Sequence, residues 1–304
     1  MTNVLQPLVS IIIPTFGRAD SLKLAIESVL SQKYENIEIV VVNDNKKNTI
    51  HYNSTNIMME GYASNNNIIY LNDGINRGGG GARNFGVKNS TAEIITFLDD
   101  DDLYYENKID EQLRHLLENN LDVSVCDMSM YKSGVEVFNK NSKSRVGSLS
   151  NFILDGNVFT PMLMLKKNKF IQVGGFSDTP RFQDHILMLK ILGSNLLIGQ
   201  IRSKLFIHNI HDGEGVTSVS NFEKGYFIRH NLEMEFISNL SSKQKREFYI
   251  NHYNTLARIE RNKGNLKLSF FYITKSVFLT RNILSLYKIL KRTLGILIKR
   301  NSKD

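Results

Sequence analysis

Short apolar runs separated by amphipathic stretches fill the first part of the chain. Three such runs, rich in β-branched residues, lie at Val9–Ile13, Ile37–Val42 and Ile68–Leu71. Runs of this length between polar residues are typical of strands buried in a parallel sheet. Between the first two runs, Leu22 and Ile26 are spaced as on one face of a helix. The order strand, helix, strand predicts a right-handed parallel unit.

A fourth apolar run begins at Glu93 and ends in four consecutive carboxylates, Asp99–Asp102. Because ligands of open α/β sheets bind beyond the carboxyl ends of the strands, we expect these acids at the mouth of a cleft. Adjacent carboxylates repel one another without a cation, and hard oxygen ligands suit Mg²⁺ or Mn²⁺. A solvated acidic loop is the alternative. An EF-hand is excluded, because Tyr104 takes the sixth position, where that loop needs Gly.

The pattern of strands and helices continues and then becomes wholly helical. Further short apolar runs lie at Val123–Cys126, Met162–Leu165, Leu196–Ile198 and Leu205–Ile207. Residues 132–148 are polar and are expected to form a surface loop, and from about Phe222 the spacing is helical to the end. We predict an α/β fold with a Rossmann-like, mixed, mostly parallel central sheet flanked by helices and a helical C-terminal extension. The expected domains are residues 1–220 and a helical, basic region of residues 221–304.

The positive charge of the chain is concentrated in its last part. The net charge is +8, and residues 243–304 carry 15 Lys and Arg against 3 Asp and Glu, or +12. Residues 1–242 therefore carry 8 − 12 = −4. Such a tail calls for an acidic partner, either nucleic acid or an anionic membrane surface. Nucleic acid is disfavoured, because aromatic residues are not interleaved with the charges in a recognised binding module.

A helical projection of the final residues separates apolar from basic side chains. One face carries Ile283, Leu286, Tyr287, Leu290, Leu294 and Leu297, and the other carries Arg281, Lys288, Arg292 and Lys299. A basic amphipathic helix of this kind can lie in the headgroup layer of an anionic membrane. The alternative is that the apolar stripe packs on the rest of the chain or on a second subunit.

Cysteine content and the N-terminus bear on location. Cys126 is the single cysteine, which excludes an intramolecular disulfide framework and indicates a reducing compartment. The first residues lack the basic segment and long apolar run of a secretion signal, and no apolar stretch reaches the about 18–20 residues of a membrane span. We expect a cytoplasmic protein, in peripheral contact with the inner face of the plasma membrane through its tail.

Two further segments carry candidate chemistry. The glycine-rich stretch Asn76–Gly86 allows close approach of the backbone to a ligand, and a helix starting near Ala82 would offer amide donors to an anion. It is neither a Walker loop nor a dinucleotide fingerprint, and a flexible turn is the alternative. Further on, Gly174 and Gly175 indicate a turn, and Asp184 is expected in the first turn of a helix.

Five motifs in order carry a family resemblance. They are Val-Ser-Ile-Ile-Ile-Pro-Thr-Phe, Val-Val-Asn-Asp, Asn-x-Gly-x-x-x-Ala-Arg-Asn-x-Gly, Phe-Leu-Asp-x-Asp-Asp, and Gly-Gly-Phe followed by Arg-Phe-Gln-Asp. Over residues 8–215 the chain resembles the family 2 glycosyltransferases, which are inverting, nucleotide-sugar-dependent enzymes with the A-type glycosyltransferase fold. A sugar-1-phosphate nucleotidyltransferase would need a Gly-rich, basic loop after the first strand, where Pro14-Thr15-Phe16-Gly17-Arg18 stands.

The resemblance implies a nucleotide site in residues 1–220. Pro14 and Thr15 match the backbone that lines the base and ribose. Asp44 matches the acid that accepts a hydrogen bond from uracil, although the Asn45-Lys46 that follows departs from the family pattern. For Asp44, the alternative is a turn or cap residue. Three charged residues complete the nucleotide side: Arg83 near the nucleotide, Asp99 at the ribose and Asp100 at the variable position of the acidic motif.

The resemblance also implies a metal and a base. Asp101 matches the last acid of the Asp-x-Asp motif and is the expected ligand of Mn²⁺ or Mg²⁺, while Asp102 caps or orients. His211 lies where some relatives place a His at the metal or diphosphate; a solvated loop residue is its alternative. Asp184 matches the catalytic base, because inversion by single displacement needs one carboxylate to take the acceptor proton. A helix cap is the alternative for Asp184.

Together these expectations describe a metal-dependent inverting hexosyltransferase. Its donor would be a UDP-sugar, and its acceptor a hydroxyl of a growing, lipid-linked glycan in the assembly of a surface polysaccharide such as a capsule or exopolysaccharide. The alternative is a non-catalytic nucleotide- or glycan-binding relative in a polysaccharide assembly complex. Contact of the tail with a second copy of the chain would make a homo-oligomer.

Overall fold

The computed structural model describes residues 6–210 and 219–280. Its strands are β1 (Val9–Thr15), β2 (Ile37–Asn43), β3 (Ile68–Leu71), β4 (Ile94–Phe97), β5 (Leu103–Tyr104), β6 (Val123–Lys132), β7 (Val135–Glu136), β8 (Leu163–Lys166) and β9 (Ile198–Ile210). In this part of the chain they form one nine-stranded sheet in the order β3-β2-β1-β4-β8-β6-β9-β5, with β7 paired to β6.

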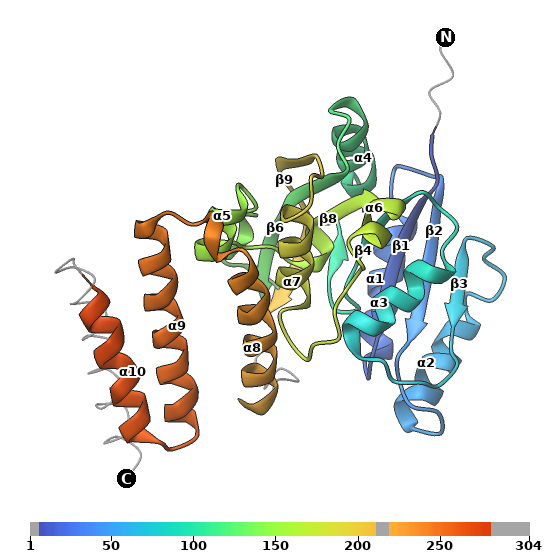
Figure 1. The fold of residues 1–304 in the computed structure, drawn as a ribbon. Coiled ribbons are helices and arrows are strands. Elements are labelled where there is room, and N and C mark those ends of the chain that lie inside the picture. Colours follow the sequence, from blue (N-terminus) through green and yellow to red (C-terminus); the bar gives the residue numbers. More distant parts are fainter. Residues whose placement is uncertain (1–5, 211–218, 281–304) are drawn as a thin grey trace.

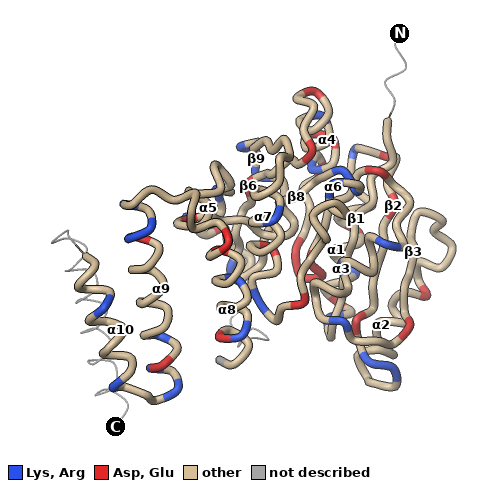
Figure 2. The backbone as a smooth tube through the Cα atoms, viewed as in Figure 1, with Lys and Arg blue, Asp and Glu red and all other residues tan. Residues whose placement is uncertain are grey.

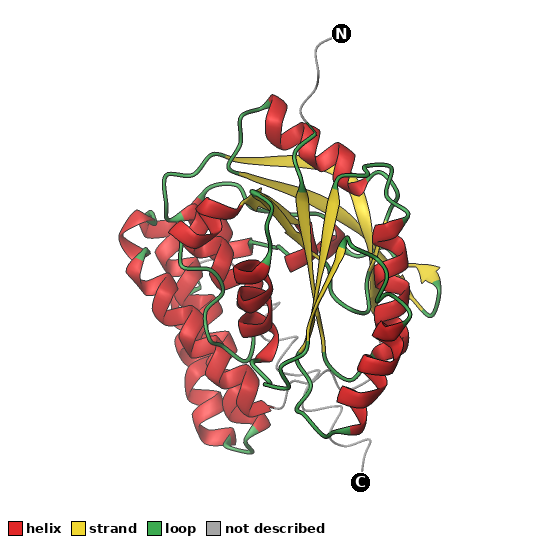
Figure 3. Cartoon of the chain, turned by 90° about the vertical axis from the view of Figure 1, so that its right-hand side faces the viewer, coloured by secondary structure: helices red, strands yellow, loops and turns green. Residues whose placement is uncertain are grey.

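The sheet is mixed, and most of its strands run in one direction. β1 pairs in parallel with β2 and β4, and β2 with β3. β8 is antiparallel to both β4 and β6, so β6 runs in the direction of β4 again, and β9 is parallel to β6. The predicted fold class is confirmed, with helices on both sides of the sheet (Figures 1 and 3).

The described part of the chain contains ten α-helices. They are α1 (Ala19–Leu30), α2 (Ile50–Glu60), α3 (Gly78–Asn89), α4 (Lys108–Glu118), α5 (Leu149–Asp155), α6 (Lys167–Gln172), α7 (Gln183–Leu192), α8 (Val219–Glu235), α9 (Ser242–Asn262) and α10 (Leu266–Leu279). α3 packs on β1 and β2, and α4 on β6, β8 and β9. The two faces of the sheet are therefore both buried, as its nearly continuous apolar strands require.

The close packing of α3 on the sheet depends on a glycine. A Cβ at Gly86 would lie 2.5 Å from Ile12 Cγ2 and 3.1 Å from Val42 Cγ2. Both neighbours are buried side chains of the sheet, so neither has room to move. This close approach fixes the position of α3 over the ends of β1 and β2.

Three observed elements differ from those expected. The run at Leu205–Ile207 and the last residue of the run at Leu196–Ile198 belong to one strand, β9. Its intervening Arg202 and Lys204 are exposed polar positions that interrupt the apolar pattern. β6 continues to Lys132 because it pairs with β9 along most of its length. The expected helix start near Ala82 is wrong. α3 begins at Gly78, since tertiary contacts outweigh the low helix propensity of its glycines.

The C-terminal helices stand beside the sheet (Figure 1). α8 contacts α7 and α9, α5 contacts α7 and α9, and α9 packs along α10. Basic positions recur along α8, α9 and α10 (Figure 2). The predicted boundary after residue 220 falls inside α8 and stays a prediction. The predicted amphipathic helix at residues 281–299 lies outside the described residues. Within residues 6–210 and 219–280, no helix combines the length and apolar character needed to cross a bilayer.

Candidate active site

The carboxyl ends of three neighbouring parallel strands deliver the candidate residues to one edge of the sheet. Thr15, the last residue of β1, is in register with Asn43, the last residue of β2. β4 ends at Phe97 on the other side of β1. Asp44 and Asp99 follow these strand ends and therefore leave the sheet at the same edge, where ligands of open α/β sheets bind.

Asp100 is tied to the end of β1. Thr15 Oγ1 donates a hydrogen bond to Asp100 at 2.8 Å, beside Pro14 in the same strand. The Arg18 guanidinium donates to Asp100 at 2.9 Å and to Asp101 at 2.6 Å. Burial raises the pKa of the Asp100 carboxyl, and the Arg18 charge opposes this. Arg18 thus pairs with two of the four acids, a contact that the sequence did not predict.

Asp99 connects the sheet edge to α7 through an arginine. Arg83, on α3, is only 8% exposed and forms an ion pair with Asp99. Its Nη1 also donates to Gln183 Oε1 at 3.1 Å. Gln183 is the first residue of α7, and Asp184 is the second. The acidic edge is therefore linked by direct contacts to the residue that precedes the predicted catalytic base.

Asp184 lies in the first turn of α7, as expected. The His185 amide donates a hydrogen bond to its Oδ1 at 2.7 Å. Burial raises the pKa of the Asp184 carboxyl, the charges of His185 and Arg83 oppose this, and the negative charge of Asp99 adds to it. Phe182, the residue just before α7, has φ of 63°, a left-handed conformation that bulky residues rarely adopt. Strain of this kind gathers at functional sites.

Asp44 holds the start of α3. Its Oδ1 accepts a hydrogen bond from the Arg77 amide at 2.6 Å, and the Gly78 amide also bonds to its carboxylate. Asn76 Nδ2 donates to the Asp44 carbonyl at 2.7 Å. Burial raises the Asp44 pKa, while the two amides lower it. In this structure Asp44 caps a helix start, and its contact with a base stays a prediction.

Asp102 contacts the C-terminal end of β9. It is 1% exposed and accepts a hydrogen bond from the Asn209 amide at 3.0 Å. His208 Nδ1 lies 3.1 Å from both of its oxygens. Burial raises the pKa of the Asp102 carboxyl. For His208, burial lowers the pKa, but the hydrogen bond to Asp102 and its charge outweigh this, so the pKa of His208 is raised. Asp102 thus contacts the end of β9, and its predicted role of capping or orienting stays a prediction.

The predicted glycine turn packs against α3. Gly174 and Gly175 both have positive φ, at 76° and 56°. Asn84, next to Arg83, binds both backbone groups of the residue after this turn: its Nδ2 donates to the Phe176 carbonyl at 2.9 Å and its Oδ1 accepts from the Phe176 amide at 2.9 Å. This clamp fixes the segment that leads to Asp184.

Comparison with known proteins decides the family. The model described as glycosyl transferase family 2 matches residues 10–181, more than half of the chain. The chain belongs to glycosyltransferase family 2. An uncharacterized glycosyltransferase of Rickettsia felis is 33% identical over 232 residues, covering 72% of this chain and 37% of that protein. The chain thus spans little more than a third of that relative's length.

Other similar proteins are named for an activity or hold a ligand. The Escherichia coli UDP-Glc:alpha-D-GlcNAc-diphosphoundecaprenol beta-1,3-glucosyltransferase WfgD is 31% identical over 135 residues, covering 44% of this chain and 48% of WfgD. S. aureus TarS 1–349 in complex with UDP-GlcNAc superposes with a TM-score of 0.61 at 16% identity, covering 92% of this chain and 91% of TarS. The mannosyltransferase PcManGT from Pyrobaculum calidifontis, with GDP-Man and Mn²⁺, gives 0.61 at 15%, covering 97% and 81%. At these identities the two structures show the shared fold alone.

The acidic edge fits the divalent metal that the family implies. Within the described residues, no three His, Cys, Asp or Glu side chains converge as a metal cage would require. Mg²⁺ and similar ions are commonly held by one or two carboxylates, with substrate phosphates and water as the other ligands. Asp101 offers such a carboxylate. Its cationic partner Arg18 is 42% exposed, so the guanidinium has room to move aside.

The structure thus brings most of the predicted site residues to one region. The residues joined by direct contacts or by a shared strand end are Pro14, Thr15, Asp44, Arg83, Asp99, Asp100 and Asp101. Asp184 is joined to them indirectly, because it follows Gln183, which Arg83 contacts. His211 lies outside the described residues, so its predicted metal role stays a prediction. Arg18 and Gln183 were missed, because nothing in their local sequence indicates partners more than 80 positions away.

Proposed function

We propose that the chain is a metal-dependent, inverting hexosyltransferase that moves a sugar from a UDP-sugar to a hydroxyl of a growing, lipid-linked surface polysaccharide. One observation carries the proposal: the contacts from Asp99 through Arg83 to Gln183 join the acidic sheet edge to the helix that bears Asp184. The donor site and the base have to lie close together, because the activated acceptor oxygen attacks the same sugar carbon that the nucleotide leaves.

Asp184 is the proposed general base. Its carboxylate would take the proton of the acceptor hydroxyl as the oxygen attacks the donor sugar from the face opposite the leaving nucleotide. Burial raises its pKa, which makes the carboxylate a stronger proton acceptor than one in water. A single carboxylate in this position suits inversion, whereas glycoside hydrolases use two that flank the bond.

The sheet edge is the proposed donor site. Pro14, Thr15 and Asp44 would line the base and ribose, with Asp99 and Asp100 near the ribose and Arg83 near the diphosphate. Asp101, together with His211, would hold Mn²⁺ or Mg²⁺. When bound, the metal supplies positive charge to the diphosphate that leaves. Arg83 is well placed to add to this charge, since it is buried and its Nε has no hydrogen-bond partner in the described structure.

The choice of donor and acceptor draws on the relatives. WfgD is named for UDP-Glc and for an acceptor sugar on diphosphoundecaprenol, and TarS binds UDP-GlcNAc. PcManGT holds GDP-Man, so the donor base has to be tested directly. The net charge of +12 over residues 243–304 supports contact with an anionic membrane surface on the cytoplasmic side, where such acceptors are assembled.

A transfer assay tests the proposal. Purified full chain is incubated with UDP-Glc, UDP-Gal, UDP-GlcNAc or GDP-Man, with Mn²⁺ or with EDTA, and with α-GlcNAc-diphosphoundecaprenol as a first acceptor. We expect UDP release and a product heavier by one sugar residue, with the anomeric configuration inverted and with loss of activity in EDTA. Turnover of GDP-Man alone would refute the uridine donor. Tight UDP binding without any product from acceptors of this class would favour a non-catalytic role.

A further inference from the structure

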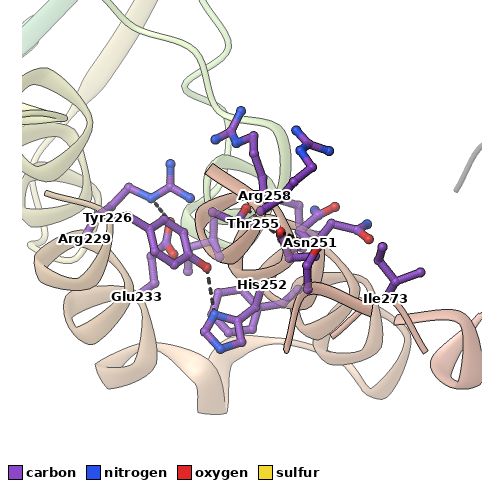
Figure 4. Close-up of a pocket in the computed structure, with 15 residues that line it drawn as sticks. Tyr226, Arg229, Glu233, Asn251, His252, Thr255, Arg258 and Ile273 are labelled. Atoms are coloured by element: carbon purple, nitrogen blue, oxygen red, sulfur yellow. Dashed lines mark hydrogen bonds and ion pairs between the residues drawn. The ribbon is translucent and has the colours of Figure 1, made fainter. Parts of the chain in front are cut away.

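A cavity between the C-terminal helices and α5 lies outside the site described above. Its volume is about 690 Å³, and it is lined by side chains of α5, α8, α9 and α10. Figure 4 shows Arg229 and Glu233 of α8 facing Asn251, Thr255 and Arg258 of α9 across this space. Cavities of this size accommodate ligands with the bulk of a sugar phosphate.

Arginines gather at this cavity without matching carboxylates. Arg229, Arg258 and Arg261 line it, and Arg181 lies close enough for its charge to act on Arg258. Among the described residues, only Arg229 of these four forms an ion pair, with Glu233. Burial lowers the pKa of Arg258, and the charges of the other three arginines lower it further. The cluster therefore carries uncompensated positive charge, which an anion would stabilise.

His252, which lines the cavity, and His230, which stacks on it, add no positive charge at neutral pH. His252 and His230 stack with ring centroids 4.0 Å apart, and Tyr226 Oη lies 2.7 Å from His252 Nδ1. Burial lowers the pKa of His252 to about 4, and burial also lowers the pKa of His230. The charge of the cavity thus comes from guanidinium groups, which bind phosphate oxygens in a bidentate manner.

The arginine cluster includes Arg181, which lies in the segment that leads to Asp184. Phe222 of α8 lies between two of the guanidinium groups, with Arg258 Cζ 4.4 Å and Arg181 Cζ 5.4 Å from its ring centroid. Gly225 allows α8 to approach closely, since a Cβ there would lie 2.9 Å from Arg181 Cβ. Arg181 thus connects the cavity to the first turn of α7, three residues before Asp184.

A second contact joins the cavity to the base. His185, next to Asp184, places its Nε2 3.3 Å from Glu233 Oε1. Glu233 is 1% exposed and lines the cavity with Arg229. The wall of the cavity and the proposed base are therefore one residue apart at this point.

We propose that this cavity binds the diphosphate of a lipid-linked sugar acceptor, so that the sugar extends toward Asp184. The inference rests on the proposed function, because it names the acceptor class of the same site. Arg258 and Arg261 hold the phosphate oxygens, and Arg181 and Arg229 complete the positive rim on the side of α7. The donor diphosphate is separate, since it belongs at the sheet edge beside Asp101.

Binding of geranyl diphosphate, a soluble prenyl diphosphate, tests the inference. Titration calorimetry is done on the full chain in metal-free buffer with saturating UDP, which occupies the donor site. We expect one saturable site, weakened at least about tenfold in Arg258→Gln/Arg261→Gln, because each charge-assisted contact to phosphate contributes about a factor of ten or more. Arg258 and Arg261 lie near the C-terminal end of α9, and Gln has a helix propensity close to that of Arg, so the double variant should keep the helix.

The control is Lys243→Gln/Lys267→Gln, which removes the same charge from exposed positions of α9 and α10 that do not line the cavity. It should change geranyl diphosphate binding less than twofold, and all variants should bind UDP and melt like the wild type. Equal binding by wild type and Arg258→Gln/Arg261→Gln overturns the inference, as does the absence of saturable binding to the wild type. Inorganic phosphate binding as tightly as geranyl diphosphate also overturns it, since the source is then free phosphate.

The two proposals fail separately. Sugar transfer by the wild type with no effect of Arg258→Gln/Arg261→Gln on geranyl diphosphate binding refutes the cavity and leaves the transferase standing. Specific geranyl diphosphate binding without turnover of any UDP-sugar supports the cavity as a diphosphate site and refutes the transferase.

Discussion

Replacement of Asp184 by Asn removes a charge and a proton acceptor while keeping the size of the side chain. The amide oxygen of Asn can still accept the hydrogen bond that the His185 amide donates at 2.7 Å. The variant loses the ability to take the acceptor proton, so kcat should fall about 10²- to 10⁴-fold, the usual contribution of general-base catalysis. The Kd for UDP should stay within about twofold, because the proposed nucleotide contacts lie at the sheet edge.

The same change should stabilise the protein at neutral pH. Burial raises the pKa of Asp184, so the folded state favours the protonated carboxyl and the charged form is costly. The stability that this group contributes is present below its unfolded pKa and is lost as pH rises through the folded pKa. Each unit by which the folded state raises the pKa of Asp184 corresponds to about 1.4 kcal/mol of lost stability above that pKa. The Tm gain at pH 7.5 should be about 2–4 °C for each kcal/mol recovered, and it should vanish toward acidic pH.

Two measurements check this prediction, with Asp178→Asn as the control. Asp178 is exposed and lies in the segment just before α7, so its replacement should change neither turnover nor melting. Initial rates of UDP release and melting curves from pH 5 to 8 are recorded for the three proteins. Wild-type turnover in Asp184→Asn would remove Asp184 from its role. A lower Tm of this variant at pH 7.5 would refute the argument from burial.

Three further changes test the metal, the packing and a buried carboxylate. Asp101→Asn should abolish the gain in UDP affinity that Mn²⁺ provides, measured by calorimetry; an undiminished gain would assign the metal to other residues. Gly86→Ala should lower stability by about 1–3 kcal/mol in urea denaturation, because the added methyl meets Ile12, whereas Gly147→Ala, with open space around it, should be neutral; equal effects would contradict the packing argument. Glu38→Ala should lower the free energy of unfolding by roughly 2–4 kcal/mol, because this buried carboxylate accepts hydrogen bonds from two hydroxyl groups and an amide at 2.6–2.9 Å. A loss under about 0.5 kcal/mol, which is typical of a surface substitution, would refute that role.

Partners from distant parts of the chain explain how four adjacent carboxylates are tolerated. Arg18 contacts Asp100 and Asp101, Arg83 pairs with Asp99, and Asp102 is held by His208. Each acid thus has a cationic or polar partner outside its own segment. In the structure, side chains supply positive charge to Asp99, Asp100 and Asp101. The predicted divalent metal at these acids stays a prediction.

The sequence alone predicted most of the strands and helices and identified the candidate acids. Apolar runs of β-branched residues predict buried strands locally, and polar residues at strand ends mark the ligand edge in any parallel sheet. The family motifs supplied the roles expected of Asp99, Asp101 and Asp184. The predicted strands are found because such predictions depend on neighbouring residues, whereas the roles of these three acids stay predictions.

Only the tertiary structure decided which side chains meet. Arg18 reaches Asp100 across 82 positions, Arg83 reaches Gln183 across 100, and His208 reaches Asp102 across 106. The arginine cluster at α8 and α9 is likewise assembled from separate segments. Hydrophobic periodicity records which face of an element is buried and carries no information on its partner. Strand order and helix packing set these partners, and with them the charge, burial and pKa on which the chemistry depends.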